Sequence, residues 1–339
     1  MFRLPHKHIK HCLVATFCLL IISNQGCMSF KGLIPAKKVV KEPLSIGFWN
    51  VENLFDLEDD PDKNDDEFAL GGRKKVDQQI YDLKIKHSSE VLQDLNVDVL
   101  GLCEVENHKV LNDLNNAYKE RNYDIIHYES PDNRGIDNAL LYDKNRFSII
   151  SSRAIENKLK NGGRTRDVLY VLGEYNNARL HIFVNHWPSN YGGKEKAIPK
   201  RTETAELIIK EIKKILIVEK SAEIILIGDF NEEPDDKNIM LLEKVGLTSL
   251  MRPMQGKPKT GTYVYRGQDG FLDQIIVNKH LQDNEKLSIV EGSAYILDLP
   301  KYRQQEGNYK HYPYRFWTGN RLLGGYSDHL AIKVEIIHK

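Results

Sequence analysis

The sequence is short of cysteine, of charge of one sign and of long hydrophobic runs, and each shortage excludes a class of protein. Its 339 residues include only 4 cysteines, too few for a small fold held together by disulfides. Its 48 lysine and arginine residues balance 48 aspartate and glutamate residues, so no basic excess indicates undiscriminating nucleic-acid binding. No hydrophobic run is long enough for an ordinary transmembrane helix. Hydrophobic residues still make up 41%, which is typical of a globular chain with a large core.

The first 26 residues are predicted to be a signal peptide, because basic residues precede the short apolar run Cys12–Ile22. The run is followed by Gly26-Cys27, which resembles a bacterial lipobox, although Asn24 stands where an aliphatic residue is usual. We therefore expect residues 27–43 to form a lipidated N-terminus and tether, with the lipid on Cys27. These features predict an exported protein that is anchored at the cell envelope, either in the periplasm or on the outer-membrane surface. A plain secretory signal or an uncleaved anchor is the alternative.

Cys103 is the only cysteine that remains if residues 1–26 are removed and Cys27 carries a lipid. No intramolecular disulfide is then available to the mature chain. Cys103 follows the apolar run Val97–Leu102 and is interpreted as a small core residue rather than a nucleophile. No cysteine–histidine group has the spacing of a structural zinc site.

From Leu44 onward, apolar runs alternate with helical patterns, without a second linker, so residues 44–339 are predicted to form one catalytic domain. Strands are predicted over residues 44–49, 97–102, 123–127, 139–142, 168–175, 179–185, 223–227, 272–277 and 330–336. Helical spacing covers residues 76–95, 108–120 and 208–216, and Asn176-Asn177 is predicted to be a hairpin turn. Many strands with few helices favour an α/β (α+β) fold in which helices pack outside two sheets.

Ionisable and amide groups gather where five of these strands end or begin. The segments are Trp49-Asn50-Val51-Glu52-Asn53, Cys103-Glu104-Val105-Glu106-Asn107, Asn185-His186-Trp187-Pro188-Ser189, Gly228-Asp229-Phe230-Asn231 and Ser327-Asp328-His329. One such segment alone is most simply a capped strand end. Five together, rich in oxygen ligands and histidine, predict a site at one rim of a sheet. Hard oxygen ligands suit Mg²⁺ or Mn²⁺.

These motifs resemble those of the endonuclease/exonuclease/phosphatase superfamily, which is deoxyribonuclease I-like, over about residues 44–337. The most specific matches are Gly228-Asp229-Phe230-Asn231 and Ser327-Asp328-His329, and Trp49–Phe55 resembles the opening motif of secreted bacterial members. The resemblance implies a four-layered α/β sandwich of two mainly antiparallel sheets flanked by helices, with the site at one rim.

The resemblance also implies roles for single residues. Glu104 matches the direct carboxylate ligand of a catalytic metal, expected to be Mg²⁺ with Mn²⁺ possible, and Asn50 and Asp328 match residues beside it. Asp229 matches the carboxylate that orients or deprotonates the attacking water, with the Asn231 amide next to it.

The phosphate-binding side of the site follows from the same resemblance. Asp273 matches the acid that pairs with His329, and His186 matches the other histidine at the phosphate. Arg166 matches a phosphate-contacting cation, although Arg164, two residues away, is an alternative.

The resemblance therefore implies a metal-dependent phosphoesterase that hydrolyses phosphodiester bonds, an endonuclease-like nuclease of the cell envelope. Its expected partners are a phosphate-ester substrate, nucleic acid foremost, and a membrane through the lipid anchor; no protein partner is predicted. A phosphatase or phospholipase, of the inositol phosphatase or sphingomyelinase type, is the alternative. Residues 272–277 lack the Trp-Cys-Asp-Arg signature of inositol phosphatases, and a non-catalytic surface binding protein is a third option. DNA, RNA and lipid headgroups are not distinguished, because specificity lies in variable loops.

One further segment, residues 56–67, is dense in acidic side chains. They are Asp56, Glu58, Asp59, Asp60, Asp62, Asp65, Asp66 and Glu67. The pattern favours a solvated loop over a second metal site, and both interpretations stay open here.

Overall fold

The computed structural model describes residues 42–339. The predicted signal peptide, the lipidation site Cys27 and all but the last two residues of the predicted tether lie outside the described residues. Within residues 42–339, no helix combines the length and the apolar character needed to cross a membrane.

The first of two large sheets contains both ends of the described chain. Its order is β13 (Leu287–Ile289), β17 (Ile332–His338), β1 (Leu44–Leu54), β2 (Val99–Val105), β4 (Asp137–Tyr142) and β3 (Asp124–His127), and β14 (Tyr295–Ile296) also pairs with β17. Only β1 and β2 run parallel; the other pairs are antiparallel. The parallel pair matters for function because both strands end at the same rim.

The second sheet has a parallel pair at its centre as well. Its order is β5 (Ser148–Ile155), β6 (Val168–Tyr175), β7 (Ala178–His186), β8 (Ile224–Asp229), β12 (Asp273–Asn278) and β9 (Leu247–Ser249). β7 and β8 are parallel and their neighbours antiparallel. Two small hairpins complete the strands, namely β10 (Tyr263–Tyr265) with β11 (Gln268–Gly270), and β15 (Trp317–Thr318) with β16 (Arg321–Leu322).

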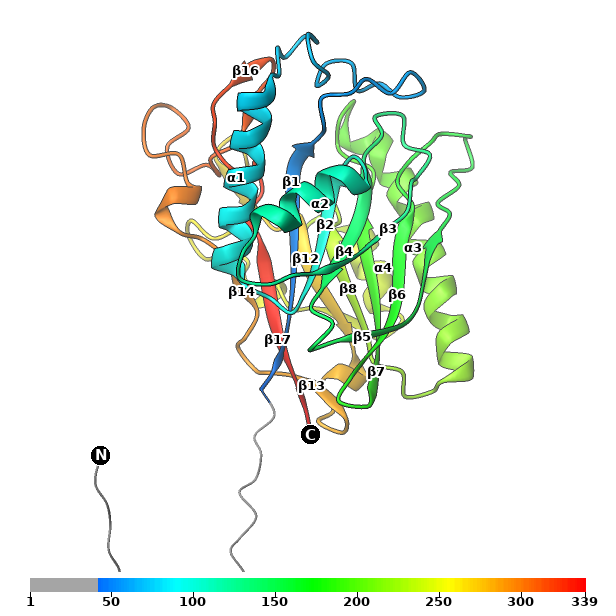
Figure 1. Ribbon diagram of the computed structural model, residues 1–339. Coiled ribbons are helices and arrows are strands. Elements are labelled where there is room, and N and C mark those ends of the chain that lie inside the picture. The colour runs from blue at the N-terminus through cyan, green and yellow to red at the C-terminus, as the bar shows by residue number, and fades with distance from the viewer. Residues whose placement is uncertain (1–41) are drawn as a thin grey trace, which may run out of the picture. The chain divides into compact units, whose positions relative to one another are not determined.

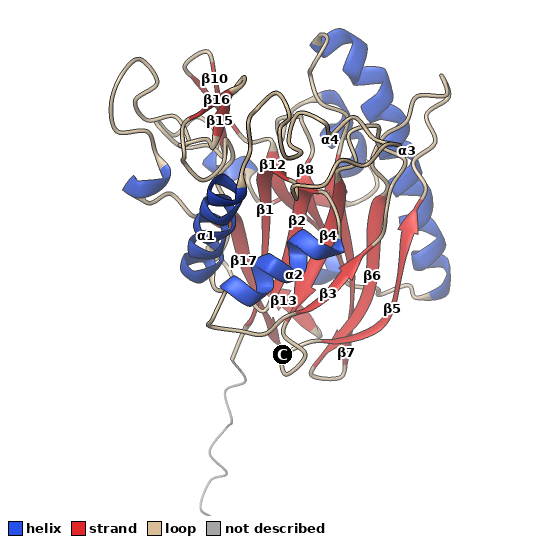
Figure 2. Ribbon diagram, turned by 45° about the horizontal axis from the view of Figure 1, so that its top comes forward, coloured by secondary structure: helices blue, strands red, loops and turns tan. Residues whose placement is uncertain are grey.

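The sheets pack face to face and helices cover their outer faces, which gives four layers (Figures 1 and 2). α1 (Gln78–Leu95) and α2 (His108–Ala117) lie against the first sheet, and α3 (Lys194–Val218) and α4 (Lys237–Glu243) against the second. The contact between sheets is close at Gly101 of β2, where an added Cβ would lie 2.7 Å from Ile227 Cδ1 and 3.1 Å from Val184 Cγ1. The predicted sandwich of two mainly antiparallel sheets is confirmed.

Most predicted elements are confirmed, and the errors have local causes. Asn176 and Asn177 form the predicted hairpin turn, with φ of 52° and 65°, the left-handed values that a type I′ turn requires. β1 and β2 continue past their predicted ends, through bulges at Glu52, Asn53 and Glu104, whose φ values are 55°, 57° and 62°. Polar residues at these bulges interrupt the apolar pattern but not the strand. β5 and α4 were not predicted, and α3 begins at Lys194, before its apolar pattern becomes regular.

Candidate active site

The candidate site lies at the rim where β1, β2, β7 and β8 end and where β12 begins. In the second sheet, the backbone register pairs Asp229 with His186 on β7 and with Asp273 on β12. Three ionisable residues on neighbouring strands are therefore held side by side by ladder hydrogen bonds. The rim is opposite to the end of the molecule where the described chain enters β1 (Figure 1).

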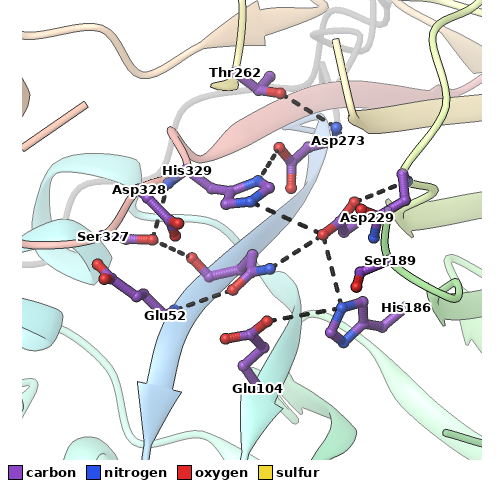
Figure 3. A network of polar contacts seen from close by, with 12 residues as sticks. Glu52, Glu104, His186, Ser189, Asp229, Thr262, Asp273, Ser327, Asp328 and His329 are labelled. Atoms are coloured by element: carbon purple, nitrogen blue, oxygen red, sulfur yellow. Dashed lines mark hydrogen bonds and ion pairs between the residues drawn. The ribbon is translucent and has the colours of Figure 1, made fainter. Parts of the chain in front are cut away.

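Asp229 lies at the centre of the site, and its side chain is buried (Figure 3). Its Oδ1 accepts the backbone N–H of Asn231 at 2.9 Å, and its Oδ2 accepts Asn50 Nδ2 at 3.2 Å. The same Oδ2 lies 3.8 Å from His186 Nε2 and 3.9 Å from His329 Nε2. Burial raises the pKa of Asp229 to about 7, against the positive charge of His329, which lowers it. A carboxylate in this state can accept a proton near neutral pH.

His329 is paired with Asp273, as in the role that the resemblance implies. Its Nδ1 lies 2.7 Å from Asp273 Oδ2, and both side chains are buried. Burial by itself lowers the pKa of His329, but the charge and hydrogen bond of Asp273 outweigh it and hold the pKa well above its ordinary value. His329 is therefore an imidazolium whose Nε2 faces the centre of the site. Its ring is tilted against the ring of Tyr263, at a centroid distance of 4.8 Å.

His186 lies across the site from His329 and carries the opposite protonation state. Burial, with the positive charges of Arg166 and Arg134 adding to it, holds the pKa of His186 well below its ordinary value. Its Nε2 lies 3.8 Å from Glu104 Oε1, and its Nδ1 has no hydrogen-bond partner among the described residues. A neutral imidazole donates one hydrogen bond without adding charge.

The residues expected to hold a metal ion offer hard oxygen donors. Glu104 Oε2 accepts the backbone N–H of Asn53 at 3.0 Å, and the side chain is 14% exposed at the rim. Asp328 is partly exposed, and one of its oxygens accepts Arg315 Nη2 at 2.7 Å. Mg²⁺ is commonly bound by one or two carboxylates, waters and substrate phosphate, so this donor set fits a divalent ion.

The site also contains a compact group of two carboxylates and one histidine. Asp229, Asp273 and His329 each place one ligand atom within 4.8 Å of the other two. The Asp273–His329 hydrogen bond already occupies this group, because a protonated histidine is no metal ligand. Glu104 and Asp328 therefore remain the candidate metal ligands, and Asp229, Asp273 and His329 the candidate proton-handling residues.

Arg166 and Asn231 share a hydrogen-bond acceptor, the backbone carbonyl of Trp187. Arg166 is buried, pairs with Asp132 Oδ2 at 3.1 Å and donates Nη2 to the carbonyl of Trp187 at 2.7 Å. Asn231 Nδ2 donates to the same carbonyl at 3.2 Å. The structure thus places Arg166 between the Asp132 carboxylate and the carbonyl of Trp187, the residue after His186, and a direct phosphate contact by Arg166 stays a prediction. Arg164, the alternative, is exposed.

A buried polar network beside Asp328 was not predicted from the sequence. Glu52 accepts the backbone N–H groups of Phe316 and Trp317 at 2.7 and 3.1 Å and lies 3.4 Å from Arg315 Nε. Burial and the charge of Asp328 raise the pKa of Glu52. Lys84, buried on α1, donates to the carbonyl of Val51 at 2.6 Å. The available signal was Lys84 itself, a lysine on the apolar face of a predicted helix.

Comparisons with known proteins agree on one family and one fold. The model of the Endonuclease/Exonuclease/phosphatase family matches residues 45–338. No curated protein matches the chain in sequence.

Solved structures of similar fold come from distant relatives. TDP2 from D. rerio, complexed with single strand DNA product, is 15% identical over 87% of this chain and 99% of that one, with a TM-score of 0.58. The human Nocturnin catalytic domain with bound sulfate is 19% identical over 88% and 95%, with a TM-score of 0.56. An endonuclease/exonuclease/phosphatase protein from Bacteroides vulgatus is 15% identical over 88% and 100%, also with a TM-score of 0.56.

Proposed function

This chain belongs to the endonuclease/exonuclease/phosphatase family, and from that premise we propose that it is a metal-dependent nuclease that hydrolyses phosphodiester bonds. The observation that carries the proposal is the buried Asp229 carboxylate between His186 and His329, with Glu104 across the same gap. These groups supply the base, the cation and the metal ligand that phosphodiester hydrolysis requires.

Each residue has one task in the proposed reaction. Asp229, with a pKa raised to about 7 by burial, orients the attacking water and accepts its proton. His329, kept cationic by Asp273, neutralises charge that develops on the phosphate in the transition state. His186 donates a neutral hydrogen bond to a non-bridging oxygen, and the Asn231 backbone N–H keeps Asp229 oriented.

The proposed cofactor is Mg²⁺, with Mn²⁺ as a substitute, held by Glu104 with Asp328 and Asn50 beside it. A divalent ion at this position supplies Lewis-acid stabilisation of the phosphate oxygens. Asn50 contributes through Asp229 as well, because its Nδ2 donates to that carboxylate.

Nucleic acid is the substrate class that we favour. One solved relative of the same fold contains a single strand DNA product. Two half-exposed arginines lie beside the site in this chain. Arg315 donates to Asp328 at 2.7 Å, and Arg134 lies 3.6 Å from Asp132 and helps to lower the pKa of His186. Half-exposed arginines near the site suit a polyanion such as nucleic acid, whose phosphates they could contact.

A substrate panel tests the proposal. It contains plasmid DNA, RNA, bis-p-nitrophenyl phosphate, sphingomyelin and inositol phosphates, each with Mg²⁺ and with chelator. We expect metal-dependent cleavage of DNA or RNA and of the artificial diester. Turnover of sphingomyelin or inositol phosphates alone would replace the nuclease by a phospholipase or phosphatase, and no turnover of any diester would refute the proposal.

We also propose that Cys27 is a lipidated N-terminus that anchors the enzyme at the cell envelope. The proposal rests on Gly26-Cys27, which follows the short apolar run Cys12–Ile22 and resembles a lipobox. Mass spectrometry of the native N-terminus tests this. A mature chain that starts elsewhere, without lipid, would contradict it.

A further inference from the structure

The helices that cover the second sheet form a groove that has no part in the proposed reaction. The groove lies between α3 and the end of α4, and its volume is about 590 Å³. Aliphatic side chains, four lysines and a single carboxylate, that of Glu206, line it. The lysines are Lys210, Lys213, Lys214 and Lys244. The groove therefore combines an apolar lining with an excess of positive charge.

The groove extends toward the end of the molecule that lies away from the active site. β7 and β8 are parallel and both end at the site, so α3, which connects them, runs back from the site. Lys213 and Ile217 thus lie near the far end, where Figure 1 shows the lower end of α3. On the other side of the groove, α4 leads into Leu247, which pairs with Asn278, the last residue of β12 and the one farthest from Asp273. A partner bound here leaves the substrate side free.

Most of the positive charge in the groove is uncompensated. Lys214 lies 2.6 Å from Glu211, but no ion pair among residues 42–339 involves Lys210, Lys213 or Lys244, and all three are exposed. The one lining carboxylate already lies 3.8 Å from a lysine outside the groove. An exposed surface with this net charge attracts an anionic partner.

Exposed aliphatic side chains lie next to these cations. Ile217 is 78% exposed and Val218 is 87% exposed, at the end of α3. The helical spacing places Lys210, Lys213 and Ile217 on one face of α3, beside the face that buries Ile212. Aliphatic side chains gain free energy when an apolar environment covers them. A partner that offers only negative charge would leave this part of the surface in water.

We propose that the groove and the end of α3 form a docking surface for an anionic lipid bilayer. A bilayer offers both features at once, namely phosphates for the lysines and an acyl boundary for Ile217 and Val218. A fluid acyl boundary accepts side chains that project this far, whereas a protein partner must match their shape. Docking through this face needs no lipid on Cys27 and directs the active site away from the bilayer.

Co-sedimentation with lipid vesicles tests the proposal. The protein comprises residues 28–339, which lack the predicted signal peptide and Cys27 but contain the whole compact unit Lys41–Lys339. It is titrated with phosphatidylcholine vesicles, with and without phosphatidylglycerol, at low and at high NaCl. We expect binding to the anionic vesicles alone, and weaker binding at high NaCl because salt screens the lysines.

Three variants separate charge from insertion. Lys210→Gln/Lys213→Gln should bind the anionic vesicles about 25-fold more weakly, because each lysine near such a surface contributes about five-fold. Lys86→Gln/Lys119→Gln, the control, removes two exposed lysines beside the helices of the first sheet and should bind like the wild type. Ile217→Ser keeps the charge and should still bind several-fold more weakly, because the apolar contact is lost.

Equal binding by the wild type and Lys210→Gln/Lys213→Gln, or an equal loss in the control, would overturn the proposal. Unchanged binding by Ile217→Ser would also overturn it, since charge alone does not distinguish a bilayer from other polyanions. Binding of polyglutamate but not of vesicles would assign the groove to an acidic protein instead.

The test is independent of the proposed nuclease activity. None of the substituted residues belongs to the proposed catalytic site, so all variants should hydrolyse bis-p-nitrophenyl phosphate at the wild-type rate without vesicles. Failure to bind vesicles would therefore leave the nuclease proposal unchanged, and failure to hydrolyse the diester would leave the docking surface unchanged.

Discussion

At the scale of single residues, burial decides which carboxyl groups carry protons near neutral pH. Asp229 and Glu106 both have raised pKa values, but in different surroundings. Asp229 faces two histidines and an asparagine. Glu106 instead lies beside the acidic residues 56–67, and its Oε2 accepts the backbone N–H of Asp56 at 2.7 Å. The raised pKa of Asp229 therefore serves the proposed chemistry, whereas the raised pKa of Glu106 affects the stability of the protein.

We predict that Asp229→Asn lowers kcat by roughly 10²–10⁴-fold with little change in KM, since a positioned base contributes about that factor. Asparagine keeps the size and the hydrogen bond from Asn231 N–H but cannot accept the proton. Steady-state kinetics on bis-p-nitrophenyl phosphate measures the effect, and Asp62→Asn is the control. A folded Asp229→Asn enzyme with turnover within a few-fold of wild type would show that Asp229 only terminates β8.

We predict that Glu106→Gln changes the pH dependence of stability. Burial raises the pKa of Glu106 from 4.5 to about 8, with Asp56 and Asp65 adding to the effect. The folded protein therefore retains a proton that the unfolded chain releases above pH 4.5. The stability from this proton is complete below that pH and is lost as the pH rises through about 8.

Glutamine cannot titrate, so the variant should gain stability relative to wild type as the pH rises. The gain is at most about 1.4 kcal/mol per pH unit. Urea unfolding of the metal-free proteins at pH 5.5 and pH 7.5 measures it. Parallel behaviour of the two proteins would place the Glu106 pKa near its ordinary value.

At the scale of elements, the site depends on how closely neighbouring strands approach. An added Cβ on Gly228 of β8 would lie 2.4 Å from the backbone oxygen of Asn185 on β7. The parallel pair that holds Asp229 beside His186 therefore leaves no space for a side chain at this position. Backbone atoms cannot rotate away, so a larger residue must displace the strand.

We predict that Gly228→Ala destabilises the protein by about 1–3 kcal/mol, the usual cost of overpacking a core, and lowers kcat by displacing Asp229. Gly101→Ala is the matched control, because its Cβ would meet side-chain atoms, the nearest being Ile227 Cδ1 at 2.7 Å, which can move. Urea unfolding and steady-state kinetics on both variants measure the difference. Equal, small effects would mean that β7 and β8 separate easily.

At the scale of the whole molecule, the site joins the two sheets. Asn50 and Glu104 come from the first sheet and His186 and Asp229 from the second, and they meet through the Asn50–Asp229 hydrogen bond and the Glu104–His186 contact. If the proposed metal site at Glu104 is correct, the ion would bind only the folded sandwich and would stabilise the two sheets together.

We predict that Mn²⁺ at about 100 times its Kd raises the free energy of unfolding by about 2.7 kcal/mol, as mass action requires. Glu104→Gln should lose this gain, and Asp65→Asn should keep it. Thermal unfolding with MnCl₂ and with chelator measures both. An undiminished gain in Glu104→Gln would remove Glu104 from the metal site.

The sequence alone determined the layers of the fold and the positions of its motifs. The strand at 168–175 follows from the apolar run Val168–Leu172, and the Asn176-Asn177 turn from residues that tolerate positive φ. These signals are local, so they can be read without knowing the neighbours of a strand. The family followed from the order of the same motifs along the chain.

Only the tertiary structure decided which polar groups are buried together. Glu52 meets the backbone of Phe316, 264 positions later in the chain, and no local pattern encodes that contact. The family resemblance implied a phosphate contact for Arg166, and only the structure shows that this side chain is buried against Asp132. The protonation states of Asp229, His186 and His329 depend on burial and on neighbours from other strands. Such properties arise when distant segments exclude water from one another, and a linear sequence does not record which segments do so.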